Sequence, residues 1–119
     1  MLVVIATPTM AGLDGFTAGL IDAGAEVVHA RSGMAALGIA KARSPALVVV
    51  DAGLQDFTSF ALVRELARVN AAIATAVISD LTPEEFHERA EGLGVLRRLP
   101  PAPGASDARE LAGHLRRIL

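Results

Sequence analysis

The sequence of 119 residues contains no cysteine, no tryptophan and no tyrosine, and only four phenylalanines. Without cysteine there is no thiolate chemistry, no disulfide, and no cysteine-ligated zinc or iron–sulfur site. Charged residues make up 20% of the chain and its formal net charge is only -2. A chain so close to neutral has no broad cationic field, which excludes a nucleic-acid binder that works by bulk charge.

Long hydrophobic runs are also missing. The clearest aliphatic runs, residues 2–6 and 46–50, have the length of a strand. They are too short to span a membrane, and the first lacks the basic leader of a signal peptide. The sequence therefore predicts a soluble, cytoplasmic protein without membrane contact.

What the chain does have is a high apolar content, 52% of its residues, spread over short and long segments. Its length suits one compact domain, residues 1–119, with a core large enough to fold without a disulfide or metal. Five short aliphatic runs predict strands. They are Leu2–Ala6, Glu26–Ala30, Ala46–Val50, Ala74–Ile78 and Val95–Leu99. The first, third and fourth are almost wholly apolar, as in strands covered on both faces, whereas the second and fifth carry charge and are expected at the edges.

Segments with helical spacing of apolar residues alternate with these runs. They cover Thr9–Ala23, Ser32–Arg43, Thr58–Asn70, Pro83–Leu93 and Asp107–Leu119. Thr82-Pro83-Glu84-Glu85 forms a capping box, and Thr7-Pro8 is expected to start the first helix in a similar way. The alternation predicts an α/β fold: one doubly wound, five-stranded parallel sheet with five helices on its two faces, the flavodoxin-like arrangement.

Ligands of such sheets bind beyond the carboxyl ends of the strands. Asp51 ends the third strand, so its carboxylate is expected at that edge. It could serve as a nucleophile that accepts a phosphoryl group, or as a cap for the turn that follows. Ser79 ends the fourth strand and Leu99-Pro100 the fifth.

This arrangement resembles the receiver (CheY-like) domain of bacterial response regulators over the whole chain. The resemblance places Asp51 on the phosphoacceptor position, Ser79 on the hydroxyl that contacts the phosphoryl group, and Pro100 on the proline after the family's lysine. It implies a signalling module of a two-component phosphorelay, not an enzyme.

The departures from the family's pattern concern the groups around the acceptor. The two acidic positions after the first strand, which help to hold Mg²⁺ in the family, are Ala6 and Thr7, and the lysine position is Leu99. Neither Ala6 nor Thr7 supplies the anionic oxygens that a hard cation prefers, and Leu99 cannot pair with a phosphoryl oxygen. Phosphoryl transfer relies on positioning and charge neutralisation. We therefore expect a degenerate receiver, without a cofactor, in which Mg²⁺ has a role only if Asp51 still accepts phosphate.

Neighbouring residues could compensate for these losses. Asp56 or Asp80 could lend a carboxylate and Arg98 a positive charge, or each could be an ordinary loop or surface residue. The three histidines show no metal-binding spacing, and no dinucleotide or phosphate-loop motif follows the first strand. A functional phosphoacceptor receiver and a small-ligand-binding flavodoxin-like domain stay open as alternatives.

The family docks partners or dimerises through its fourth helix, fifth strand and fifth helix, and the resemblance implies the same surface here. The family's aromatic switch position on the fifth strand is Leu96. The candidate interaction residues are Glu88, Leu96, Arg97, Arg98 and Arg109. An acidic helix beside a basic strand and helix can form complementary pairs with a protein partner or across a two-fold axis, or can be paired within the chain.

Overall fold

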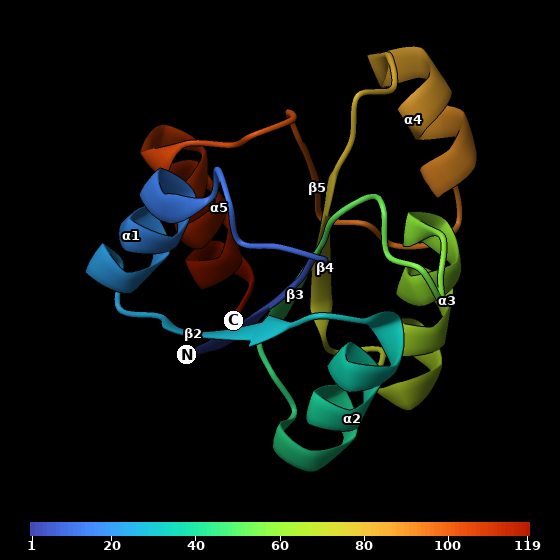
Figure 1. Ribbon diagram of the computed structural model, residues 1–119, viewed down its shortest axis with the longest axis horizontal. Coiled ribbons are helices and arrows are strands. Elements are labelled where there is room, and N and C mark those ends of the chain that lie inside the picture. Colours follow the sequence, from blue (N-terminus) through green and yellow to red (C-terminus); the bar gives the residue numbers. More distant parts are fainter.

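The computed structural model describes all residues, 1–119, as five strands alternating with five helices (Figure 1). The strands are β1 (Leu2–Ala6), β2 (Glu26–Ala30), β3 (Leu47–Val50), β4 (Ala74–Ile78) and β5 (Arg97–Leu99). The helices are α1 (Asp14–Asp22), α2 (Gly33–Arg43), α3 (Ser59–Val69), α4 (Pro83–Ala90) and α5 (Ala105–Ile118). None of these helices combines the length and the apolar character needed to cross a membrane.

The strands form one parallel sheet in the order β2-β1-β3-β4-β5, which confirms the predicted fold class. The two strands predicted at the edges, β2 and β5, lie there. Strand order reverses between β1 and β3, where Ala6 pairs with Val50. The residues that follow these two strands therefore meet at the switch point, the usual ligand position of this fold.

Alternate residues of the strands build two separate cores, because successive side chains point to opposite faces. Val4 and Val48 face α2 and α3, whereas Val3 and Val49 face α1 and α5. All four valines are completely buried. Figure 1 shows the same division, with α1 and α5 packed together on one side and α2 and α3 on the other. Helix α4 projects beyond α3, and its one buried residue, Phe86, belongs to the core on the α2 and α3 side.

Two predicted helix starts have different outcomes. The capping box is confirmed: the Thr82 hydroxyl accepts a hydrogen bond from the Glu85 amide, and the Glu85 carboxylate accepts one from the Thr82 amide. The predicted start at Thr7-Pro8 is wrong, because α1 begins only at Asp14. The hydroxyl of Thr9 accepts from the Ala11 amide, and such local bonds compete with helix formation.

The last strand and the fourth helix are both shorter than predicted. Helix α4 ends at Ala90 and β5 begins at Arg97, so residues 91–96 form a longer connection than expected. Gly92 and Gly94 both have positive φ angles, of 79° and 70°. Backbone of that kind continues neither a helix nor a strand. The connection separates α4 from the sheet edge.

Candidate functional site

The site at the switch point is built around a contact between Thr7 and Asp51. Thr7 follows β1, is completely buried, and donates its hydroxyl to the Asp51 carboxylate over 2.8 Å. The same hydroxyl lies 2.8 Å from the carbonyl oxygen of Thr9, so its proton is shared between two acceptors. Sequence reasoning identified both positions but not the hydrogen bond that joins them.

The second oxygen of the Asp51 carboxylate faces the loop after β3. It accepts a hydrogen bond of 2.8 Å from the Ala52 amide. The half-buried Asp51 side chain therefore has both oxygens engaged by neutral donors. This geometry supports the interpretation of Asp51 as a residue that caps its own turn.

The residues at the other positions where the resemblance implied phosphoryl contacts lie in different surroundings. The Ser79 hydroxyl, at the end of β4, accepts a hydrogen bond of 3.1 Å from the Leu81 amide. Leu99 is completely buried in the core shared with α1 and α5. The guanidinium of Arg98 comes within 3.4 Å of the Ser79 carbonyl oxygen, not of the Asp51 carboxylate. The strand end that carries the family's lysine thus supplies no cation to Asp51.

The residues beside Asp51 do not fit a magnesium ion. Ala6 is buried and has no ligand atom, and the Thr7 hydroxyl is neutral. No group of three or more His, Cys, Asp or Glu side chains is placed to hold a metal. Because Mg²⁺ prefers carboxylate oxygens in a near-octahedral arrangement, this edge of the sheet lacks the necessary donors.

Asp56, considered above as a substitute ligand, has another position. Its carboxylate accepts hydrogen bonds from the Gly33 amide (2.9 Å) and the Met34 amide (3.0 Å) at the start of α2. The possibility that Asp56 lends its carboxylate to a metal site beside Asp51 is therefore wrong. The contact ties the loop after β3 to α2, where the Phe57 ring also packs against Gly33.

This contact predicts a pH dependence of stability. The backbone amides of Met34 and then Gly33 lower the pKa of Asp56 below its usual value. A carboxylate with a lowered folded pKa stabilises the protein fully above the unfolded pKa, near 4, and loses this contribution as the pH falls through the folded value. Urea unfolding should show wild type more stable than Asp56→Asn at pH 7, with the difference shrinking below about pH 4. A difference that is constant down to pH 2 would contradict this origin.

Sequence reasoning did not find the positions of two residues near the site, His29 and Arg89. The Nε2 atom of His29, on the edge strand β2, donates to the Thr7 carbonyl oxygen over 2.8 Å. Arg89 on α4 lines a hollow together with Ser79 and Thr58. Neither residue belongs to a motif, so only their positions in space reveal the contacts.

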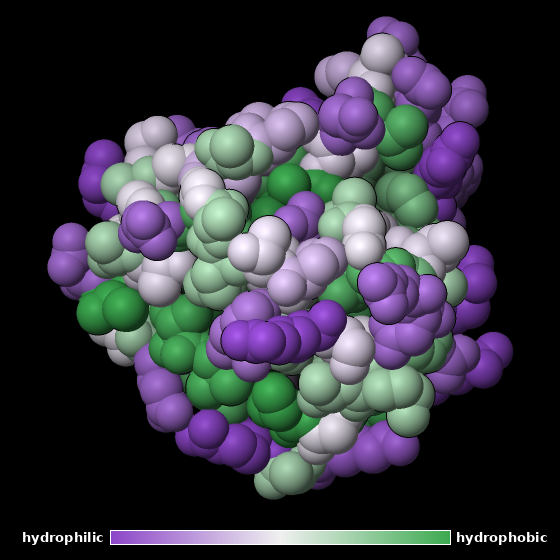
Figure 2. All heavy atoms as spheres, viewed as in Figure 1, coloured by the Kyte–Doolittle hydropathy of each residue, from purple (hydrophilic) through white to green (hydrophobic).

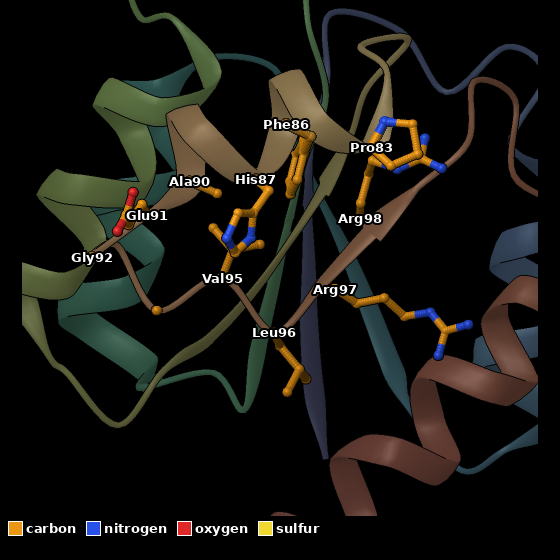
Figure 3. Close-up of a pocket in the computed structure, with 11 residues that line it drawn as sticks. Pro83, Phe86, His87, Ala90, Glu91, Gly92, Val95, Leu96, Arg97 and Arg98 are labelled. Atoms are coloured by element: carbon orange, nitrogen blue, oxygen red, sulfur yellow. The ribbon is translucent and has the colours of Figure 1, made fainter.

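A groove of about 510 Å³ separates α4 from β5 on the predicted interaction surface (Figure 3). His87 and Leu96 line it from the two sides. In Figure 3 the Arg97 side chain points away from α4 towards α5, where it forms an ion pair with Glu110. Of the charges predicted on this surface, Arg97 is thus paired within the chain, whereas Glu88 and Arg109 are exposed.

Comparisons with known proteins bear on the fold. No protein-family model matches the sequence, and no curated protein matches it. Among solved structures, the chain is similar to the Francisella response regulator 1452 receiver domain, with 16% identity, a TM-score of 0.84, and coverage of 99% of this chain and 98% of that one. It is also similar to the chemotaxis response regulator CheY4 of Vibrio cholerae (19% identity, TM-score 0.82, 99% and 98% covered). It is similar, too, to the REC domain of AraT, a response regulator from Geobacillus stearothermophilus, with 19% identity and a TM-score of 0.83, over 98% of this chain and 93% of that one. These likenesses, at low identity, cover nearly the whole chain and are likenesses of architecture. The chain therefore adopts the CheY-like receiver fold.

Proposed function

We propose that this chain is a receiver-like signalling module of a two-component system whose state is not set by phosphorylation of Asp51. The observation that carries the proposal is the hydrogen bond from the buried Thr7 hydroxyl to the Asp51 carboxylate. In this arrangement a neutral donor occupies the position from which an acidic residue would hold a cation. The module acts through contacts with proteins and has no catalytic role of its own.

The chemistry at Asp51 supports this proposal. An aspartyl phosphate forms when the carboxylate attacks phosphorus and the bond from phosphorus to the donor's leaving group breaks, while cations neutralise the equatorial oxygens. Here the lysine position is the buried Leu99, and Arg98 is directed to the Ser79 carbonyl oxygen. Whichever oxygen attacks, Asp51 would also weaken one of its hydrogen bonds, the one from the Thr7 hydroxyl or the one from the Ala52 amide. Both effects raise the barrier for phosphoryl transfer.

The surface formed by α4, β5 and α5 is the proposed docking site. Figure 2 shows mainly hydrophilic side chains around the projecting α4. Glu84, Glu85 and Glu88 are exposed on α4, and Arg109 and Arg117 are exposed on α5. Opposite charges on neighbouring elements suit a charged protein partner or a second copy of the chain related by a two-fold axis.

Sedimentation and intact-mass spectrometry, each with and without acetyl phosphate, test the proposal. We expect acetyl phosphate to leave both the sedimentation coefficient and the intact mass unchanged, because the Asp51 site lacks the required cations. Any homodimer or partner complex should weaken at high salt, since exposed charges are screened within about 8–10 Å at physiological ionic strength. A mass increase of one phosphoryl group that disappears in Asp51→Asn would establish the functional phosphoacceptor instead. A co-purified small molecule in native mass spectrometry would favour the flavodoxin-like alternative.

A charge reversal on α5 tests the docking surface itself. Arg109→Glu is expected to weaken homodimer or partner binding by about 0.5–1 kcal/mol, because Arg109 is exposed and unpaired within the chain. Arg64→Glu, an exposed arginine on α3, is the matched control and should bind like wild type. Equal effects of the two substitutions would place the contact elsewhere.

A further inference from the structure

An apolar hollow of about 230 Å³ lies between α3, the start of β4 and the connection from α4 to β5. Five of its eight lining residues are hydrophobic, none is charged, and Thr75 carries the one polar side chain. Because β4 begins at Ala74, the hollow lies at the opposite end of the strands from Asp51 and Ser79. It therefore has no part in the site at the switch point.

Buried side chains and one backbone hydrogen bond bring the walls of the apolar hollow together. Val63 of α3 and Ile73, just before β4, are buried in one core, and Leu93 of the connection packs against that core. The Leu96 amide donates to the carbonyl oxygen of Thr75 over 2.8 Å, which fixes the end of the connection to β4. The hollow is therefore part of the folded domain and needs no ligand in order to form.

The hydroxyl of Thr75 is nearly buried and has no partner. Thr75 is only 4% exposed. It shares a strand face with Val77, which belongs to the core beside α3, because alternate residues of a strand point the same way. No group of the chain forms a hydrogen bond with its hydroxyl, and its side chain lines the apolar hollow. A nearly buried polar group without a hydrogen bond is unfavourable, so a ligand that supplies one gains affinity.

The lining restricts what can occupy this space. A buried water molecule usually makes about three hydrogen bonds, whereas the lining side chains offer only the Thr75 hydroxyl. A charged ligand is equally unsuitable, because no lining side chain supplies a counterion. An apolar cavity of about 150 Å³ holds benzene, so the apolar hollow has room for a ring with small substituents.

We propose that the apolar hollow binds a small neutral molecule with an apolar ring and one hydroxyl group, which pairs with the hydroxyl of Thr75. The ring packs against Val63, Ile73 and Leu93, and the burial of its surface supplies most of the affinity. The binding goes beyond the docking function proposed above and does not depend on it.

The connection between α4 and β5 is shared by the apolar hollow and the groove beside α4. Gly92 and Gly94 line both spaces, and Figure 3 shows the connection running along that groove from Gly92 to Leu96. A Cβ atom at either glycine would meet no other atom within 4 Å, so neither position is packed. A ligand behind the connection should therefore slow amide hydrogen exchange at residues 92–96. Only an effect on docking would rest on the proposed function.

The test is a titration of the ¹⁵N-labelled protein with p-cresol, a neutral ring that carries one hydroxyl group. We expect saturable amide shifts at residues 63, 67, 71–75 and 92–96, with a dissociation constant of about 1 mM. Residues 51 and 79 should not shift, because they lie at the other end of the sheet. Shifts centred on residues 83–87 of α4, shifts spread over both cores, or no saturable shift would overturn the proposal.

The substitution Thr75→Val removes the hydroxyl and keeps the shape of the side chain. It should weaken p-cresol binding about fivefold, the effect of one hydrogen bond. Toluene, which has no hydroxyl, should bind this variant at least as well as it binds wild type. Equal weakening of p-cresol and toluene, or unchanged binding of p-cresol, would contradict the role of Thr75.

Two neighbouring alanines provide a matched pair that locates the ligand. Ala71 lines the apolar hollow, whereas Ala72, next to it and also exposed, does not. Ala71→Leu should fill the space and weaken p-cresol binding at least about tenfold, and Ala72→Leu should bind like wild type. Unchanged binding in Ala71→Leu, or equal loss in both variants, would place the ligand elsewhere. Amide spectra away from the hollow should coincide in all proteins and so verify that each variant is folded.

Discussion

Replacing Thr7 with aspartate is expected to make the stability of this protein depend on divalent cations. The Thr7 hydroxyl is completely buried and lies 2.8 Å from an oxygen of Asp51, so a carboxylate there faces that of Asp51. Two carboxylates without a counterion repel each other, and we expect the free energy of unfolding to fall by about 3 kcal/mol in the presence of a chelator. Millimolar Mg²⁺ should restore much of that loss, because paired carboxylates supply the oxygens that the cation prefers.

Urea unfolding followed by circular dichroism measures this effect, since the chain has no tryptophan or tyrosine for fluorescence. Thr7→Asn is the matched control, because it has the same shape as aspartate without the charge, and its stability should not respond to Mg²⁺. Wild type should not respond either. If Mg²⁺ stabilises wild type and Thr7→Asp equally, the cation binds somewhere other than at Asp51, and our account of the site is wrong.

Replacing Gly19 with valine is expected to disrupt the packing of α1 against α5. A Cβ atom at Gly19 would lie 2.8 Å from the Cβ of Ala108 and 2.9 Å from the carbonyl oxygen of Ala105. The backbone of α5 would have to move, and overpacking of this kind costs about 2–3 kcal/mol. The midpoint of urea unfolding should fall accordingly.

Gly38 offers a control within the same protein. It lies in α2, and a Cβ atom there meets no other atom within 4 Å. Gly38→Val therefore introduces the same side chain into a helix without the clash, and its unfolding free energy should stay within about 0.5 kcal/mol of wild type. Similar losses in the two variants would mean that the α1–α5 contact does not cause the effect, since valine has a higher helix propensity than glycine.

The order of the elements and a parallel sheet with the second and fifth strands at its edges were accessible from the sequence. Apolar runs such as Leu2–Ala6 and Ala74–Ile78 form strands with the predicted bounds, because strands covered on both faces need continuous aliphatic residues. The capping box at Thr82 marked the start of α4 correctly, since it requires only local hydrogen bonds. Local chemistry and periodicity were sufficient wherever the decisive contacts lie within a few residues along the chain.

The start of α1 was missed because it depends on longer-range contacts. Thr7 is a plausible helix cap by type, but its hydroxyl is used by Asp51, 44 residues away in the sequence. Asp56 likewise could be a metal ligand or a turn residue until the structure places it at the start of α2. In both cases one side chain had several possible partners, and the fold selected one.

The amino-acid sequence therefore determined the alternating α/β architecture and the positions of Asp51 and Ser79 at strand ends, because these follow from short aliphatic runs and from helical spacing of apolar residues along the chain. Tertiary structure alone decided that Thr7 bonds to Asp51, that Arg97 pairs with Glu110, and that Arg89 lines a hollow with Thr58 and Ser79. The physical reason is that a polar side chain can satisfy its hydrogen bonds in many ways. Which partner it finds depends on which segments the packed sheet brings together.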